Sequence, residues 1–140
     1  MIKFKLFSVG KSKESWLKEA LNEYEKRLKS EASFQFIWTK DNEQLENLVS
    51  KEPYVICLDS DGEMMNSEKF SQYLMRAVEK GGSNLSFVIG GAEGLPQTMR
   101  EKYPLFSLSK MTYTHQIARL IIIEQIYRAF EIAKGTKYHK

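Results

Sequence analysis

Three segments of the chain place small, hydroxyl-bearing or glycine residues where an apolar run ends, a composition suited to ligand binding. They are residues 58–62 (Leu-Asp-Ser-Asp-Gly), 90–94 (Gly-Gly-Ala-Glu-Gly) and 108–113 (Leu-Ser-Lys-Met-Thr-Tyr). Paired glycines let a backbone approach a ligand closely, and hydroxyls and free backbone amides can hydrogen-bond its polar edges. The residues alone leave open whether Gly90 and Gly91 serve a ligand or form only a tight turn.

The two histidines, His115 and His139, are the other candidates for chemistry, because imidazole exchanges protons near neutral pH. His115 is interpreted either as a capping or hydrogen-bonded structural residue or as a catalytic one. His139 follows Tyr138 in the terminal tail. That tail is either solvated or positioned to stack on a base and contact phosphate.

The segment 107–140 is basic, with six Lys or Arg residues against two Glu, whereas the preceding 106 residues are nearly balanced. A neutral body with a basic end favours a polyanionic partner at that end. Within this segment, Lys110 and Arg119 are either solvated or in contact with phosphate.

Composition excludes several other classes of protein. The single Cys57 rules out an internal disulfide framework and fits a reducing, cytoplasmic setting. One Cys and two distant His lack metal-ligand spacing, so no metal is expected. Gly10 is isolated, which argues against a dinucleotide fingerprint or a phosphate-binding loop. No apolar run is long enough to span a membrane, and no signal peptide opens the chain.

Alternating strand and helix patterns predict the elements that position these residues. Strands are predicted at 2–9, 34–39, 54–58, 85–89 and 105–108, with a turn at 59–62. Helices are predicted at 16–28, 42–50, 67–80 and 96–102, with a last one capped by Thr112 or Thr114 and ending at Gly135; Ser12 or Ser15 is expected to cap the first.

This alternation predicts an α/β fold class, a single domain over residues 1–140 with a mostly parallel sheet and helices on both faces. Ligands of such sheets bind at the carboxyl ends of the strands. The three segments are therefore expected at one edge of the sheet.

The last helix is apolar on nearly every side, from Ile117 to Ile132. Such a helix must be covered on most sides. A partner subunit is one cover, which predicts a homodimer. The alternative is a central helix of a monomer.

Several motifs together resemble the RlmH family, which are bacterial ribosomal RNA large-subunit methyltransferases of the SPOUT class. They are 87–95 (Phe-Val-Ile-Gly-Gly-Ala-Glu-Gly-Leu), 108–116 (Leu-Ser-Lys-Met-Thr-Tyr-Thr-His-Gln), 124–129 (Glu-Gln-Ile-Tyr-Arg-Ala) and the terminal Tyr138-His139-Lys140. Residues 8–11 and 24–28 also resemble it. The resemblance runs from the first residue to the last.

The resemblance implies a SPOUT-like fold with a C-terminal trefoil knot, a homodimer, and S-adenosylmethionine as methyl donor. It implies methylation of N3 of a pseudouridine in a 23S rRNA stem-loop on the assembled ribosome. The implied cofactor contacts are Leu58, Gly90, Leu108, Ser109, Lys110, Met111, Thr112 and Tyr113. The tail would lie near the partner's cofactor pocket and help to place the RNA.

The N3 proton must leave during such a reaction, which calls for a general base or for stabilisation of the anionic base. His139 is the first candidate base, and Arg119 or Arg128 a candidate for holding phosphate or the developing negative charge. Residues expected to contact RNA are Arg128, Lys137, Tyr138 and Lys140.

Two other functions stay open at this point. One is a non-catalytic RNA- or ribosome-binding α/β module, in which the strand ends serve only as turns. The other is a SPOUT methyltransferase acting on tRNA, although the short chain leaves no room for a separate RNA-recognition domain.

Overall fold

A computed structural model describes residues 1–11 and 13–139, in which five parallel strands form one sheet in the order β2-β1-β4-β3-β5. The strands are β1 (Ile2–Val9), β2 (Ala32–Thr39), β3 (Val55–Glu63), β4 (Asn84–Ile89) and β5 (Leu105–Phe106). The helices are α1 (Ser15–Leu28), α2 (Asn42–Val49), α3 (Ser67–Lys80), α4 (Gln97–Lys102) and α5 (His115–Lys134).

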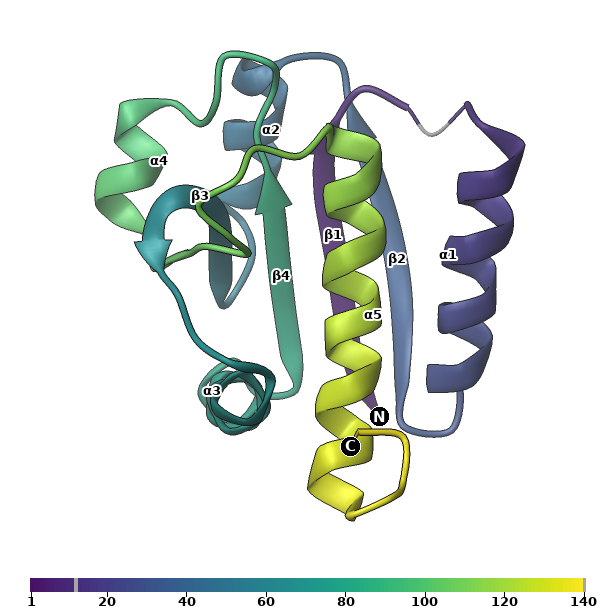
Figure 1. Ribbon diagram of the computed structural model, residues 1–140. Helices are drawn as coiled ribbons and strands as arrows, with labels where there is room; N and C mark the ends of the chain where they lie inside the picture. Colours follow the sequence, from purple (N-terminus) through teal and green to yellow (C-terminus); the bar gives the residue numbers. More distant parts are fainter. Residues whose placement is uncertain (12, 140) are drawn as a thin grey trace.

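Helices cover both faces of this sheet (Figure 1). One face packs against α1, α3 and α5, where Phe4, Leu74 and Ile126 belong to a single buried cluster. The other face packs against α2 and α4 through Leu45 and Met99. Strands covered on both sides are expected to be nearly all apolar, as β3 is over residues 55–58 and β4 is over residues 87–89. The predicted fold class is confirmed, whereas the trefoil knot stays a prediction.

The turn predicted at residues 59–62 is wrong, because β3 continues through these residues to Glu63. Its pairing with β5 shifts register between Leu58 and Glu63, both of which lie opposite Phe106. The bulge requires a close approach at Gly62, where a Cβ would lie 2.6 Å from the backbone of Leu105 and Phe106. Residues with turn preferences therefore form an irregular strand here, because β5 pairs with this part of β3.

The predicted strand at 105–108 is also shorter in the structure, because only Leu105 and Phe106 pair with β3. Ser107 still donates its backbone N–H to the carbonyl of Glu63 at 2.9 Å, and the chain then continues toward α5. The predicted cap of α1 at Ser15 is wrong, since Glu14 precedes the helix and makes no side-chain cap. Ser12, the other candidate, lies outside the described residues.

The ends of α5 follow the predicted signals. Thr114 accepts a hydrogen bond from the backbone N–H of Ile117, and Gly135 ends the helix with φ of 71°. α5 lies over the sheet between α1 and α3 (Figure 1). Ile122 and Ile126 on its inner side are fully buried, but Ile117 remains 39% exposed. The helix thus crosses the molecule and joins the segment before Thr114 to the tail.

Candidate functional site

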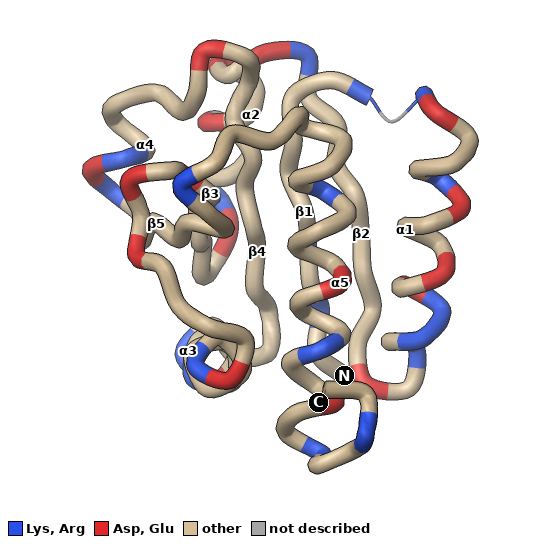
Figure 2. The backbone as a smooth tube through the Cα atoms, viewed as in Figure 1, with Lys and Arg blue, Asp and Glu red and all other residues tan. Residues whose placement is uncertain are grey.

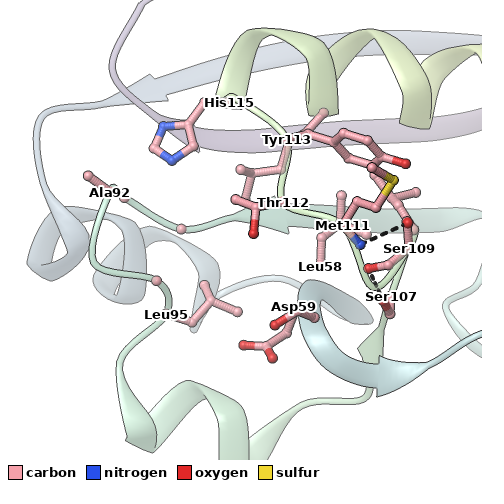
Figure 3. Close-up of a pocket in the computed structure, with 17 residues that line it drawn as sticks. Leu58, Asp59, Ala92, Leu95, Ser107, Ser109, Met111, Thr112, Tyr113 and His115 are labelled. Atoms are coloured by element: carbon pink, nitrogen blue, oxygen red, sulfur yellow. Dashed lines mark hydrogen bonds between the residues drawn. The ribbon is translucent and has the colours of Figure 1, made fainter.

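A cavity of about 250 Å³ opens at the carboxyl edge of the sheet, where β4 and β5 end and β3 becomes irregular after Leu58. All three segments singled out in the sequence contribute to its lining, and their side chains face a common space (Figure 3). Predicted cofactor contacts among the lining residues are Leu58, Gly90, Leu108, Ser109, Met111, Thr112 and Tyr113. Lys110 is the exception: it is exposed and is absent from the lining.

The glycine segment forms a tight loop against the cavity. A Cβ on Gly90 would lie 2.9 Å from the carbonyl carbon of Gly94 and from the backbone nitrogen of Leu95. Gly94 closes the loop by donating its N–H to the carbonyl of Gly91, at 2.8 Å. Gly90 is thus required by a close approach of backbone to backbone, and this approach brings the loop to the cavity edge.

Asn42, the first residue of α2, holds this loop from outside the cavity. Its amide nitrogen donates to the carbonyl of Gly94 at 2.9 Å, and its Oδ1 accepts from the N–H of Gly91 at 3.1 Å. One side chain thereby fixes both ends of the turn. Asn42 was not among the sequence candidates, because it lies 49 residues before Gly91 and nothing in the local pattern connects them.

The segment between β5 and α5 folds onto itself through its hydroxyls. Ser107 Oγ donates to the carbonyl of Ser109 at 2.9 Å, and Ser109 Oγ accepts from the N–H of Met111 at 3.0 Å (Figure 3). These bonds curl the backbone around the cavity. They leave the Met111 side chain 74% exposed at its edge.

Asp59 and His115 also line the cavity. Asp59 was missed as a binding residue, although its position directly after Leu58, where the sequence predicts a strand to end, is the signal that could have found it. His115 does not cap α5, since Thr114 does so. Its position at the cavity therefore favours the functional interpretation over the capping one.

Arg119 lies outside the cavity lining and is 1% exposed. Its Nε donates to Ser8 Oγ at 3.0 Å and its Nη2 to the carbonyl of Val9 at 2.9 Å, and the guanidinium lies 4.6 Å from the ring centre of Trp38. Burial lowers the pKa of this guanidinium, while the charge of Glu14 opposes the shift. Arg119 therefore ties α5 to the carboxyl ends of β1 and β2.

The terminal tail folds back on α5, at the far end of that helix from the cavity (Figure 1). Arg128 Nη1 lies 3.0 Å from His139 Nδ1, and His139 Nε2 lies 2.7 Å from Glu68 Oε1. An arginine can only donate, so Nδ1 accepts and the imidazole proton sits on Nε2, facing Glu68. His139 is thus held between Arg128 and Glu68.

Glu124 completes this cluster by accepting from both Arg128 Nη2 at 2.9 Å and the hydroxyl of Tyr138 at 2.7 Å. Burial raises the pKa of Tyr138, and the bond to Glu124 raises it further. The structure thus brings together Arg128, Tyr138 and His139, but not Arg119. Lys137 is exposed, and Lys140 lies outside the described residues.

The basic end of the chain is partly neutralised in the structure. Arg128 pairs with Glu124, and Lys134 pairs with Glu31 and Glu131. In Figure 2, acidic and basic residues are interspersed along α1 instead of gathering by sign. The segment 107–140 keeps its excess of basic residues, but two of the six, Arg128 and Lys134, have acidic partners.

The cavity lining combines apolar wall with hydrogen-bonding groups. Leu95 and Leu108 give it apolar wall, while Ser109, Thr112 and the glycine loop supply hydroxyls and backbone groups. Among the described residues, no group of three or more His, Cys, Asp or Glu is placed to hold a metal ion. Within the same residues, no helix has the length and apolar character needed to cross a membrane.

The fold and this cavity define an α/β protein with a cavity at the carboxyl edge of a parallel sheet. Residues 2–139 match the family model described as "Predicted SPOUT methyltransferase". The chain therefore belongs to the SPOUT methyltransferase family.

Curated relatives carry a more particular name. The chain is 51% identical to "Ribosomal RNA large subunit methyltransferase H" of Protochlamydia amoebophila, with all of both chains covered. It is 40% identical to the protein of the same name from Streptococcus mutans, with 99% of this chain and all of the relative covered. The resemblance stated from the motifs is thereby confirmed.

Proposed function

We propose that the chain is a ribosomal RNA large-subunit methyltransferase that uses S-adenosylmethionine and methylates N3 of a pseudouridine in a 23S rRNA stem-loop. It acts on the assembled ribosome, in the cytoplasm, as a single domain over residues 1–140. The observation that carries this proposal is the cavity, which assembles the predicted strand ends in a chain similar over its full length to methyltransferases of this name.

The cofactor would be held by Leu58, Gly90 and residues 108–113, with Lys110 reaching it only from the rim. When bound, S-adenosylmethionine supplies a methyl group on a sulfonium, which is already a good leaving group. The protein must then align the nitrogen of the substrate and exclude water. The curled segment 107–111 provides the rigid side of that pocket.

His139 is the proposed general base for the N3 proton. In the folded chain its Nδ1 accepts from Arg128, so the lone pair that would take the proton is occupied. Substrate must therefore displace Arg128 from His139 Nδ1. The freed guanidinium can then contact a phosphate or the anionic base. The catalytic role predicted for Arg119 stays a prediction, and its burial means that replacing it would lower stability as well as activity.

A homodimer would bring His139 to a cofactor. α5 has 20 residues and is therefore about 30 Å long, so the start of the tail is remote from the cavity in the same protomer. We propose that the tail of one protomer, with Lys137, Tyr138 and Lys140, serves the cavity of its partner. The exposed Ile117 on α5 and Trp16 on α1 offer apolar surface for that contact.

The proposal is tested with ribosomes and radioactive S-adenosylmethionine. Label is expected in 23S rRNA when unmethylated ribosomes are the substrate, and mass spectrometry should locate it on N3 of a pseudouridine. Transfer to tRNA instead would favour the related tRNA enzyme. Absence of both transfer and cofactor binding would favour the non-catalytic binding module.

Replacing His139 tests its role in the reaction. His139→Ala is expected to abolish transfer and leave cofactor affinity nearly unchanged. His139→Gln is the matched control, since an amide can still bridge Arg128 and Glu68 but cannot act as a base. If the Gln variant retains wild-type turnover, His139 serves only as a structural bridge.

A further inference from the structure

The cavity wall carries an ion pair that the reaction scheme above does not use. Arg100, on α4, approaches Asp59 with its Nε 3.0 Å from Oδ2, and its Nη2 lies 2.7 Å from Asp61 Oδ2. Asp59 lines the cavity and its side chain is 12% exposed. The N–H of Asp61 also donates to Asp59 Oδ1 at 2.9 Å, so the carboxylate is fixed in place.

Asp59 gives the cavity its acidic character. Of the described residues that line it, Asp59 is the only acidic one, and none is Lys or Arg. Arg100 lies behind Asp59 and outside the lining. The pair therefore has Asp59 on the cavity side and Arg100 on the far side, where the guanidinium contacts both carboxylate oxygens at 3.0 and 3.4 Å.

The donor and the product of methyl transfer differ in charge. S-adenosylmethionine carries a sulfonium, an ammonium and a carboxylate, which leaves one net positive charge. Loss of the methyl converts the sulfonium to a neutral thioether, so S-adenosylhomocysteine has no net charge. A carboxylate on the wall consequently distinguishes the two ligands, although their shapes are almost the same.

We propose that Asp59 and Arg100 set the preference of this cavity for the cationic donor over the neutral product. Asp59 attracts the donor, and Arg100 limits that attraction by neutralising part of the carboxylate charge. This inference rests on the proposed function, because it takes S-adenosylmethionine as the ligand.

The magnitude follows from the size of the cavity. A sphere of its volume is about 8 Å across. A change of one unit charge on the wall, acting over about 8 Å at an effective dielectric constant of about 40, alters an affinity about fivefold. The neutral product feels little of this change. The ratio of the two affinities is therefore the quantity to measure.

Calorimetric titration of the intact protein with each of the two ligands tests the proposal. Asp59→Asn removes the negative charge from the cavity wall, while Arg100 stays paired with Asp61, and should lower the donor-to-product affinity ratio about fivefold. Arg100→Gln leaves Asp59 unpaired and should raise the ratio by a similar factor. The double variant removes both members of the pair, so its ratio should lie between those of wild type and Asp59→Asn, whereas Arg100→Lys should keep the wild-type ratio.

A purely structural ion pair gives a different result. Losing it would weaken the binding of both ligands alike and leave the donor-to-product affinity ratio unchanged in both single variants. That outcome overturns the inference alone. Failure of the wild-type protein to bind either ligand would overturn the proposed function and the inference with it. Thermal unfolding of each variant identifies any that fails to fold. If an Asp59 variant fails, the affinity ratios of Arg100→Lys and Arg100→Gln are compared with each other.

Discussion

Adding one methyl group at Gly90 should disrupt the cofactor loop, whereas the same change at Gly91 should not. Gly90 has an ordinary negative φ, so alanine meets no backbone strain there. Its Cβ would instead lie 2.9 Å from two backbone atoms of Gly94 and Leu95. An ordinary contact needs at least 3.4 Å, and neither backbone atom can swing aside as a side-chain end could. The loop must therefore move as a unit.

The expected cost of Gly90→Ala is about 2 kcal/mol of folding free energy, in the range of overpacked sites. Moving the loop also misplaces backbone groups at the cavity. Loss of one or two hydrogen bonds, each worth about 1 kcal/mol, would lower the affinity for S-adenosylmethionine about tenfold. At Gly91 the nearest atom to a new Cβ is Asn42 Oδ1 at 3.5 Å, an ordinary contact. Gly91→Ala should therefore be neutral or stabilising by about 0.5 kcal/mol.

Urea unfolding and calorimetric titration of the two variants measure both effects. Gly90→Ala should lose stability and cofactor affinity together, and Gly91→Ala should lose neither. Wild-type stability and affinity in Gly90→Ala would refute the close approach between Gly90 and Gly94. Equal losses in both variants would refute the claim that the two neighbouring glycines have different roles.

Two further predictions concern residues around the cavity. Burial, assisted by the charge of Asp59, raises the pKa of Cys57 to about 12. At pH 8 its thiol should therefore react with a disulfide reagent about a thousandfold more slowly than an ordinary cysteine. Unfolding in urea should restore the ordinary rate. Equal rates with and without urea would contradict that burial. Asn42→Ala removes both contacts to the glycine loop and should weaken cofactor binding several-fold. Asn42→Asp, which can still accept from Gly91, should fall between wild type and Ala; an unchanged affinity in both variants would argue against the clamp.

Local pattern was sufficient to predict most elements. β1 and β4 were predicted within a residue because apolar runs bounded by glycine are typical of buried strands. Thr114 and Gly135 bound α5 because their side-chain and backbone preferences act over a few residues. The error at residues 59–62 has a different origin. Asp, Ser and Gly have turn preferences, but pairing with β5 extended the strand, and pairing depends on a segment more than 40 residues away.

The candidate cavity shows the same division. The sequence by itself determined that Leu58, Gly90 and residues 108–113 share one edge, because parallel strands end at the same side of a sheet. Only the tertiary structure decided that Asn42 holds the glycine loop, that Arg100 stands behind Asp59, and that Arg119 is buried against Ser8. These contacts join residues about 40 to 110 positions apart, and no local periodicity encodes such distances. They arise when the packed core brings the elements together, which is why they become visible only in the folded chain.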